Sequence, residues 1–301
     1  MKPTVFVPEP IASAGMDLLR AECAGVDNLP QADAVVVRLF QIRADDLLRA
    51  PRLKVIAKHG VGVDNIDVAA ATSRNIPVVF TPTANANAVA EHTLTLMLAL
   101  ARNLYPASAA VFAGRWPKCE GVELAGKTLG VIGLGRIGRR VAEMARHGFA
   151  MEVLAFDPLV SKSDFTHAAS LEAALRAADF LTLHLPLTPE TRHLVNADRL
   201  RLLKPTCRII NTSRGGVIDE GALAQALRDG RIAGAALDVF EKEPLPVGHP
   251  FLTTPNTLLT PHISSSTKES LDRMARDAAQ GVLDVLQGRK PAHVVNPEVY
   301  G

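Results

Sequence analysis

A glycine-rich turn set between a strand and a helix constrains this chain more than any other feature of its sequence. Gly133, Gly135 and Gly138 form the pattern G-x-G-x-x-G. The apolar run 128–132 before them is typical of a strand, and the segment 136–147 after them has the periodicity of a helix. In this setting the first glycine makes a tight turn, the second lets backbone approach a pyrophosphate, and the third lets the helix pack on the strand. The segment therefore predicts a dinucleotide-binding unit rather than a purely structural turn.

An acidic residue downstream indicates which dinucleotide binds. The strand-like run 152–156 ends at Asp157, roughly twenty residues after the last glycine, where a ribose-binding acid belongs. A carboxylate there accepts hydrogen bonds from both ribose hydroxyls and repels a 2′-phosphate. Pro158 and Leu159 follow instead of the arginine that a phosphorylated cofactor favours, although Lys162 is close in sequence. The sequence therefore favours NAD over NADP.

Length, charge and cysteine content narrow the class of protein. A chain of 301 residues is long for one core and fits two domains. A net charge of +2 and an aromatic content of 4% give no reason to expect nucleic acid or a membrane as partner. Three widely spaced cysteines argue against a disulfide framework, and no H-E-x-x-H or similar cluster indicates a metal. Without a signal peptide or an apolar helix of bilayer length, the protein is expected to be cytoplasmic.

Strand-like and helix-like segments alternate along most of the chain, which is typical of parallel sheets covered by helices. The strand candidates form two series: 4–7, 34–37, 54–57 and 78–80, then 128–132, 152–156, 180–184, 208–211, 233–237 and 257–259. A helical run over 88–103 connects the series, and 268–287 is a strongly amphipathic helix. The tail 290–301 is expected to return to the first series. The pattern predicts an α/β protein of two doubly wound sheets, with an active site at the carboxyl ends of strands.

Four further segments, in a consistent order, carry a resemblance to a known family. They are HGVGVDNID at 59–67, NTSRGGVID at 211–219, LDVFEKEP at 237–244 and TPHI at 260–263. With the glycine turn they make the chain resemble the D-isomer-specific 2-hydroxyacid dehydrogenases, especially phosphoglycerate dehydrogenases and hydroxypyruvate or glyoxylate reductases. The resemblance implies a Rossmann NAD-binding domain, expected over 101–286, inserted into a flavodoxin-like substrate-binding domain, expected over 1–100 and 287–301.

Three residues can carry the family's reaction, which interconverts a D-2-hydroxy acid and its 2-keto acid. Arg214 follows the strand 208–211, and its guanidinium can grip a carboxylate through two parallel hydrogen bonds. A surface-turn arginine is the alternative. His262 lies in the loop after the last strand, and imidazole is the natural acid/base at neutral pH. The resemblance makes Glu243 the partner of this histidine, whereas Glu241 is interpreted as a loop charge.

The resemblance also implies residues that contact the ligands. For NAD they are Arg136 and Ile137 at the pyrophosphate, Leu185 and Pro186 at the adenosine, Thr212 and Ser213 near the nicotinamide, Asp238 at its carboxamide, and Thr81 and Ser264 as further candidates. Ser264 stands where many relatives have a glycine. Val61 and Gly62 are expected to present N–H groups to the substrate carboxylate, with Asn85 at the mouth of that pocket. Arg38 either binds a phosphate or second carboxylate, as phosphoglycerate requires, or is a solvated strand-end charge.

The remaining histidines are not expected to act as the proton donor. His59, His92 and His184 are candidates for the neighbourhood of the cleft. The others are expected to be solvated: His147, His167, His193, His249 and His293.

Two rival functions share this scaffold. NAD-sensing corepressors keep the same arginine, glutamate and histidine but carry partner-binding extensions, which this compact chain is not expected to have. Formate or phosphonate oxidation is the other alternative. Serine feedback, as in longer phosphoglycerate dehydrogenases, is not expected for a chain ending at Gly301. The resemblance further implies a homodimer, with 112–122, including Trp116, as its contact arm.

Overall fold

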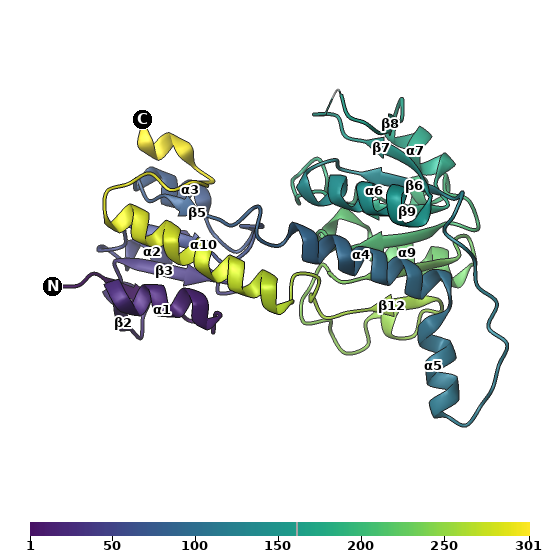
Figure 1. Ribbon diagram of the computed structural model, residues 1–301, viewed down its shortest axis with the longest axis horizontal. Coiled ribbons are helices and arrows are strands. Elements are labelled where there is room, and N and C mark those ends of the chain that lie inside the picture. Colours follow the sequence, from purple (N-terminus) through teal and green to yellow (C-terminus); the bar gives the residue numbers. More distant parts are fainter. Residues whose placement is uncertain (161) are drawn as a thin grey trace. The chain divides into compact units, whose positions relative to one another are not determined.

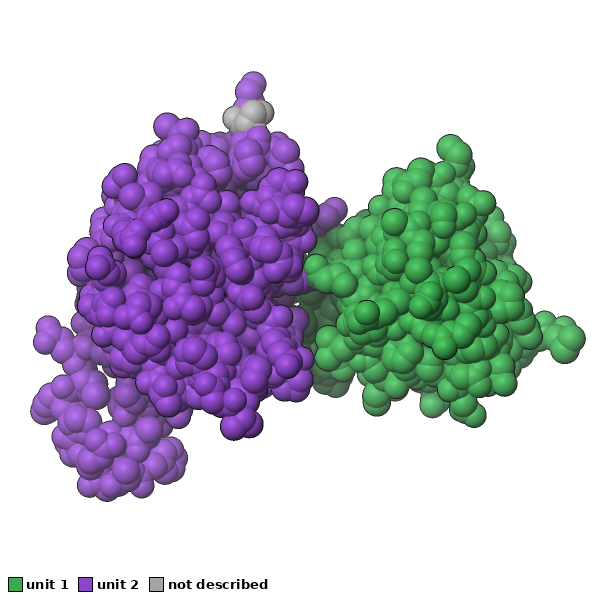
Figure 2. All heavy atoms as spheres, turned by 180° about the vertical axis from the view of Figure 1, so that it is seen from behind, with its two compact units in different colours: residues 1–86, 265–301 green, residues 87–264 purple. Residues whose placement is uncertain are grey.

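The structure is a computed structural model that describes residues 1–160 and 162–301 (Figure 1). It divides into two compact units, which Figure 2 colours separately. Unit 1 comprises Met1–Ala86 and Ser265–Gly301, and unit 2 comprises Asn87–Ser264. Each unit is built on its own parallel sheet. The predicted α/β class with two parallel sheets is therefore confirmed.

Unit 1 has a five-stranded sheet in the order β2-β1-β3-β4-β5, the flavodoxin-like order. Its strands are β1 (Thr4–Phe6), β2 (Ala24–Val26), β3 (Ala34–Val37), β4 (Val55–Lys58) and β5 (Val78–Val79). Its helices are α1 (Ser13–Glu22), α2 (Ala44–Leu48), α3 (Val68–Ser73) and α10 (Lys268–Leu286), with 3₁₀ turns η1 (Leu29–Gln31) and η4 (Pro297–Tyr300). Strands β3 and β4 are buried along their whole length, because helices cover both faces of a parallel sheet.

Unit 2 has a seven-stranded sheet in the order β12-β11-β10-β9-β6-β7-β8. Its strands are β6 (Thr128–Ile132), β7 (Glu152–Phe156), β8 (Thr166–His167), β9 (Phe180–Leu183), β10 (Arg208–Asn211), β11 (Gly234–Leu237) and β12 (Thr257–Leu259). Its helices are α4 (Ala86–Ala101), α5 (Leu104–Phe112), α6 (Arg136–Phe149), α7 (Leu171–Ala177), α8 (Ala197–Leu200) and α9 (Glu220–Arg228), with η2 (Gly215–Val217) and η3 (Pro250–Leu252). The strand order reverses between β6 and β9. The carboxyl ends of these two strands are therefore the topological switch point, where such sheets bind ligands.

The unit boundaries differ from the expected domain boundaries at 100 and 286. Helix α10, expected in the NAD-binding domain, packs on the sheet of unit 1, where Ala278 and Val282 share a core with Val36. Gly15 of α1 lies so close to α10 that a Cβ atom there would sit 2.3 Å from the Ala275 carbonyl oxygen. An amphipathic pattern specifies which face of a helix is buried but not which sheet covers it.

Helix α4 is the second difference. The sequence placed most of this run in the substrate-binding domain, but its apolar face belongs to unit 2. Leu94, Met97 and Ala101 are buried in the same core as Leu129 of β6 and Val141 of α6. Unit 2 therefore begins at the start of α4.

Helix α5 stands away from the body of unit 2 (Figures 1 and 2). Its apolar side chains are largely exposed, with Phe112 92% exposed and Trp116, shortly after the helix, 82% exposed. Within the described ranges, no single helix is long and apolar enough to cross a membrane. Helices α4 and α5 meet that test only as a pair, with a bend of 65° between them.

Candidate active site

In unit 2 the glycine turn and the acidic residue lie together at the switch point. The N–H of Gly133 donates to the Phe156 carbonyl over 2.9 Å. The two Asp157 oxygens accept the N–H groups of Leu134 and Leu159, at 2.8 and 2.9 Å. The carboxylate thus joins the end of β7 to the turn after β6. Each of its oxygens has a further lone pair that can accept a hydrogen bond from a ribose hydroxyl.

The N-terminus of α6 offers the space that a pyrophosphate requires. No side chain caps this helix, so the N–H groups of its first turn, which includes Arg136 and Ile137, have no intrahelical acceptor. A Cβ atom on Gly135 would meet no other atom within 4 Å, whereas one on Gly138 would sit 2.0 Å from the Gly133 carbonyl oxygen. The open side at Gly135 and the tight side at Gly138 fit a bound dinucleotide.

The residues expected at the adenosine follow β9. The Cδ2 atom of Leu185 would lie 3.0 Å from a Cβ atom on Gly133, so this side chain borders the glycine turn. Pro186 comes next, and its carbonyl accepts the Thr191 hydroxyl at 2.6 Å. Their contact with adenosine remains a prediction.

The loop that carries Arg214 is held from within by Asn211, the last residue of β10. The Asn211 Oδ1 atom accepts the N–H of Ser213 at 3.0 Å and its hydroxyl at 2.8 Å. The Asn211 Nδ2 atom donates to the Arg214 carbonyl at 2.9 Å. Arg214 itself donates from Nη1 to the Ser213 carbonyl, and the buried Thr212 hydroxyl lies 2.9 Å from that of Thr93. The role of Asn211 was not predicted, although an asparagine at a strand end is a common source of such turns.

The structure brings His262 and Glu243 together. The His262 Nδ1 atom lies 2.7 Å from Glu243 Oε2, and Glu243 Oε1 accepts the Phe240 N–H at 3.0 Å. Partial burial raises the pKa of Glu243, but the hydrogen bonds from His262 and Phe240 outweigh it and hold the pKa below its usual value. His262 has a φ of 54°, a left-handed conformation that is uncommon for a residue other than glycine. The contact at Nδ1 leaves Nε2 as the nitrogen that can exchange a proton with a substrate.

Asp238 supports the segment that carries this histidine. Its Oδ1 atom accepts the Thr260 hydroxyl at 2.6 Å and the Ile263 N–H at 2.9 Å, and its Oδ2 atom accepts the Ser264 N–H at 2.8 Å. Burial raises the pKa of Asp238, but His92, 3.6 Å away, and these hydrogen bonds hold it below its usual value. Whether Asp238 and Ser264 also contact the nicotinamide amide remains a prediction.

In unit 1 the predicted substrate loop follows β4. Gly60 has a φ of 143°, which favours glycine, and Val61 and Gly62 come directly after it. The fully buried Thr81 clamps this turn, because its N–H donates to the Gly60 carbonyl at 2.9 Å and its hydroxyl lies 3.1 Å from both the N–H and the carbonyl oxygen of Gly60. The predicted contact of Thr81 with the cofactor is a separate matter and remains a prediction.

Cationic and unpaired polar groups lie near the same loop. The Lys58 ammonium donates to the Arg38 carbonyl and to Asn65 Oδ1. Burial, together with the charges of Arg38 and Lys58, lowers the pKa of His59 to about 4. Both ring nitrogens of His59 and the Oδ1 atom of Asn85 are buried without a hydrogen-bond partner in the described part of the chain.

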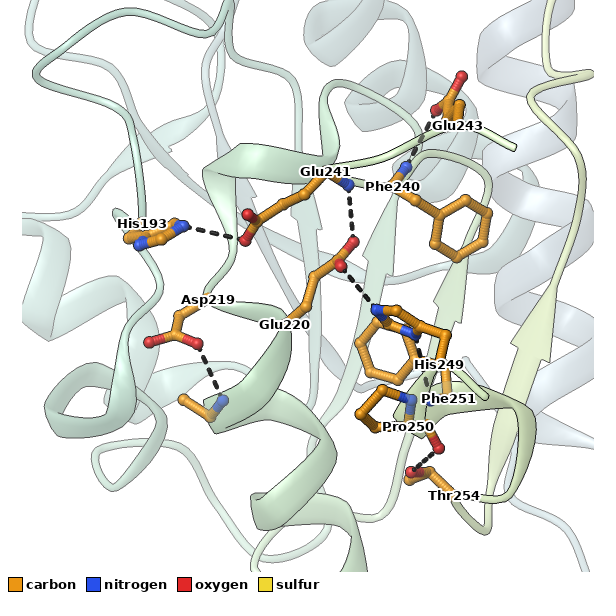
Figure 3. Close-up of polar contacts among 11 residues, drawn as sticks. His193, Asp219, Glu220, Phe240, Glu241, Glu243, His249, Pro250, Phe251 and Thr254 are labelled. Atoms are coloured by element: carbon orange, nitrogen blue, oxygen red, sulfur yellow. Dashed lines mark hydrogen bonds and ion pairs between the residues drawn. The ribbon is translucent and has the colours of Figure 1, made fainter. Parts of the chain in front are cut away.

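The expectation that His249 is solvated was wrong. Its side chain is 15% exposed, and its Nε2 atom lies 3.0 Å from Glu220 Oε2 (Figure 3). His193 pairs with Glu241 at 2.9 Å, so the interpretation of Glu241 as a loop charge agrees with its half-exposed position. Among the described residues, no group of three His, Cys, Asp or Glu side chains is placed to hold a metal ion.

Comparison with known proteins adds to this geometry. The family model of the D-isomer specific 2-hydroxyacid dehydrogenase NAD binding domain matches residues 94–264. The chain is 44% identical over 280 residues to a D-3-phosphoglycerate dehydrogenase of Methanocaldococcus jannaschii, covering 90% of this chain but 53% of that protein. It is 40% identical to a glyoxylate reductase of Thermofilum pendens, covering 99% of this chain and 96% of the relative. The chain thus spans about half the length of the curated phosphoglycerate dehydrogenase that it matches.

A solved structure has the same fold. The NADPH-dependent glyoxylate/hydroxypyruvate reductase of Sinorhizobium meliloti, in complex with NADP and malonate, is 29% identical and superimposes with a TM-score of 0.90. The match covers 98% of this chain and 97% of the other. From the family model and the near full-length match to the glyoxylate reductase, we conclude that the chain belongs to the D-isomer specific 2-hydroxyacid dehydrogenase family.

Proposed function

We propose that this protein is an NAD-dependent oxidoreductase that interconverts a D-2-hydroxy acid and its 2-keto acid. The observation that carries the proposal is the contact of 2.7 Å between His262 Nδ1 and Glu243 Oε2. It lies in the same unit as the open glycine turn at Gly135 and the arginine loop at Arg214. An oriented imidazole, a guanidinium and a dinucleotide cradle are the parts that reduction of a keto acid requires.

Each residue has a distinct role in the proposed reaction. The nicotinamide supplies the hydride at its C4 atom when bound. Arg214 binds the substrate carboxylate and fixes the keto carbon in place. His262 donates a proton from Nε2 to the keto oxygen during reduction and takes it back during oxidation. Glu243 holds the imidazole by Nδ1 and stabilises its charged form.

The proposed cofactor is NAD. The Asp157 carboxylate at the end of β7 repels a 2′-phosphate, and neither of the next two residues supplies a positive charge. The Sinorhizobium relative is described as NADPH-dependent, so the preference has to be measured for this chain. NADH is expected to have a KM at least about 10-fold below that of NADPH, because the repulsion acts on NADPH alone.

The proposed substrates are small 2-keto acids such as glyoxylate, hydroxypyruvate and phosphohydroxypyruvate. Backbone N–H groups at Val61 and Gly62 bind the carboxylate, and Asn85 supplies a buried oxygen that has no partner among the residues that the structure describes. Arg38 is the candidate contact for a phosphate or second carboxylate.

The test is steady-state turnover with NADH and NADPH side by side. The keto acids are glyoxylate, hydroxypyruvate, phosphohydroxypyruvate and pyruvate, and formate and phosphite are offered with NAD. Reduction of at least one keto acid supports the proposal. Turnover of formate or phosphite alone, or binding of NADH without any turnover, contradicts it and favours the corresponding rival function.

We further propose that the protein forms a homodimer through the segment 112–122. Phe112 and Trp116 are large apolar side chains that are almost fully exposed, and such groups commonly mark an interface. Light scattering after size exclusion is expected to give a dimer for the wild type. The double variant Phe112→Ser, Trp116→Ser is expected to be a monomer; a monomeric wild type contradicts the proposal.

A further inference from the structure

A second glutamate holds the loop on which Glu243 lies. Glu220, the first residue of α9, accepts the Glu241 N–H with Oε1 at 2.8 Å (Figure 3). The preceding N–H, that of Phe240, goes to Glu243 itself at 3.0 Å. Two consecutive peptide N–H groups are therefore held by two different carboxylates, one from α9 and one from the loop that faces His262.

Glu220 is in turn held by His249. Its Oε2 atom lies 3.0 Å from His249 Nε2, and the two side chains are only 12% and 15% exposed. The other ring nitrogen of His249, Nδ1, lies 3.3 Å from the Phe251 N–H and accepts from it. Since Nδ1 accepts, the ring proton sits on Nε2 and is donated to Glu220. Both oxygens of this carboxylate are thereby committed, and its orientation is fixed.

The same loop is braced on its other side by the arginine loop. A Cβ atom on Gly215, next to Arg214, would lie 1.9 Å from the Phe240 carbonyl carbon and 2.3 Å from the Glu241 nitrogen. The backbone at 240–241 therefore lies between Gly215 and Glu220, and it approaches Gly215 so closely that no side chain fits between them.

The charged and titratable groups around Glu220 lie on the loop of Glu241 and beside η3, where His249 lies. Partial burial raises the pKa of Glu220, the nearby Glu241 carboxylate raises it further, and the Glu241 N–H and His249 act in the opposite direction. His193 lies 2.9 Å from Glu241 and offsets part of that repulsion. The groups that face Glu220 are thus His249, Glu241 and, through Glu241, His193.

We propose that Glu220, oriented by His249, is a positioning residue for the reaction: it fixes the loop 240–243 so that Glu243 meets His262 Nδ1. The proposal rests on the proposed function. Glu220 acts through Glu243 and does not touch the substrate. Without it the Glu241 N–H loses its acceptor, the loop moves, and the histidine keeps its place on Asp238 but loses its oriented carboxylate.

The test compares three variants. Glu220→Ala removes both contacts, and Glu220→Gln keeps an oxygen for the Glu241 N–H. Glu241→Gln is the matched control, because it removes the negative charge that faces His193 but keeps the N–H that Glu220 holds. Glu220→Ala is expected to lower kcat roughly 10-fold to 100-fold, since small misplacements near reacting groups have effects of this size. Glu220→Gln should lose less, the KM for NADH should stay unchanged, and Glu241→Gln should resemble the wild type.

Two further readouts separate positioning from a merely structural role. In Glu220→Ala the pH above which reduction fails should move lower, because an imidazolium with a loosened carboxylate partner deprotonates more readily. Adding Glu220→Ala to Glu243→Gln should lower kcat less than about 2-fold further, since both changes remove the same interaction. Independent, multiplying effects overturn the proposal, as does an unchanged kcat and pH profile in a folded Glu220→Ala protein.

A measurement without substrate distinguishes failure of this inference from failure of the proposed function. The wild type should show a low-field proton resonance from the hydrogen-bonded Nδ1–H of His262 that is absent in Glu243→Gln. It should broaden or vanish in Glu220→Ala and persist in Glu241→Gln. An unchanged resonance in Glu220→Ala overturns the inference even if the protein reduces no keto acid. A wild type without turnover but with these resonance changes overturns only the proposed reaction.

Discussion

The two units differ in how completely their buried polar groups are hydrogen-bonded. In unit 2, buried polar side chains such as Asp238, Asn211 and Thr93 all have hydrogen-bond partners. Within 1–160 and 162–301, every buried side-chain nitrogen or oxygen without a partner belongs to unit 1: His59 Nδ1 and Nε2, Arg74 Nη1, Asn85 Oδ1, Ser270 Oγ and Tyr300 OH.

This difference shows which candidate site residues already have all their hydrogen bonds before any ligand binds. A fully satisfied network is rigid and specifies one geometry, as the candidate catalytic loops of unit 2 require. An unpaired buried polar atom costs about 1–3 kcal/mol of stability. At His59, which precedes the predicted substrate loop, and at Asn85, that cost agrees with the proposal that a substrate supplies the missing partners.

The largest expected effect is on kcat and comes from replacing His262, the proposed proton donor in unit 2. His262→Asn should lower kcat by about 10² to 10⁴, because an amide cannot serve as an acid at neutral pH. Asparagine tolerates the left-handed backbone at this position, so the fold should survive. The measurement is kcat for the best keto acid, with NADH affinity by fluorescence titration as the control. A fall of less than 10-fold, with NADH binding intact, assigns the proton to another group.

The next effect is on stability and compares two positions of the glycine turn, the crowded Gly138 and the open Gly135. Gly138→Ala forces a Cβ atom to within 2.0 Å of the Gly133 carbonyl oxygen, which has to shift. It should destabilise unit 2 by about 3 kcal/mol, the upper end of the usual cost of overpacking, because the new atom overlaps backbone. Thermal unfolding of the free protein is the measurement.

Gly135→Ala is the matched control for that substitution. Its φ of −69° suits alanine, and the new Cβ atom meets nothing within 4 Å, so stability should change by less than about 0.5 kcal/mol. NADH affinity should nevertheless fall, because the methyl group occupies the space that the pyrophosphate needs. Equal losses of stability in the two variants contradict this reading of the turn.

Elements with strong local signals were predicted closely. All the predicted strands are present, with ends within one residue of the predicted ones, because each is a continuous apolar run between turn residues. The short edge strands β2 and β8 were missed, since three and two residues carry too little pattern. The Glu243 contact with His262 was also anticipated, from the resemblance rather than from local physics.

Features that depend on tertiary packing were not predictable. Helix α10 has one clear apolar face, but nothing within it says that Gly15 of α1, far away in sequence, makes room for it. Likewise, Glu220 and His249 lie 29 residues apart, and each looks like an ordinary surface residue until the fold buries both. Their pairing depends on the distance between α9 and η3, which no local pattern records.

A smaller effect is the pH dependence of stability that arises from His59, one of the unpaired buried residues of unit 1. An unfolded histidine has a pKa of about 6.5, whereas that of His59 in the fold is lowered to about 4 by burial and by Arg38. The unfolded chain therefore binds the proton first as pH falls, so stability is present above pH 6.5 and is lost towards pH 4. The expected loss from this group is about 3 kcal/mol.

His59→Leu should lose less stability over that interval, since leucine does not titrate. Hydrogen exchange of the β3 and β4 amides at pH 7, 5.5 and 4.5 reports on unit 1 alone. Comparison above pH 4.5 limits the contribution of carboxylates such as Asp33, whose pKa is also below its usual value. Parallel pH dependences in His59→Leu and the wild type contradict a buried, neutral His59.

The smallest effect tests the comparison between the units directly with two buried hydroxyls. The Ser270 hydroxyl on α10 has no partner among the residues described, whereas that of Thr93 on α4 donates to the Val89 carbonyl at 2.7 Å and lies 2.9 Å from the Thr212 hydroxyl. Ser270→Ala removes an unsatisfied group and should be neutral or stabilise unit 1 by up to about 1 kcal/mol. Thr93→Val leaves Thr212 without a contact and should destabilise unit 2 by about 1–2 kcal/mol. Urea unfolding followed by hydrogen exchange assigns each change to its unit. Opposite signs support the contrast; a clear loss of stability in Ser270→Ala means that its hydroxyl has a partner after all and that the contrast fails at this position.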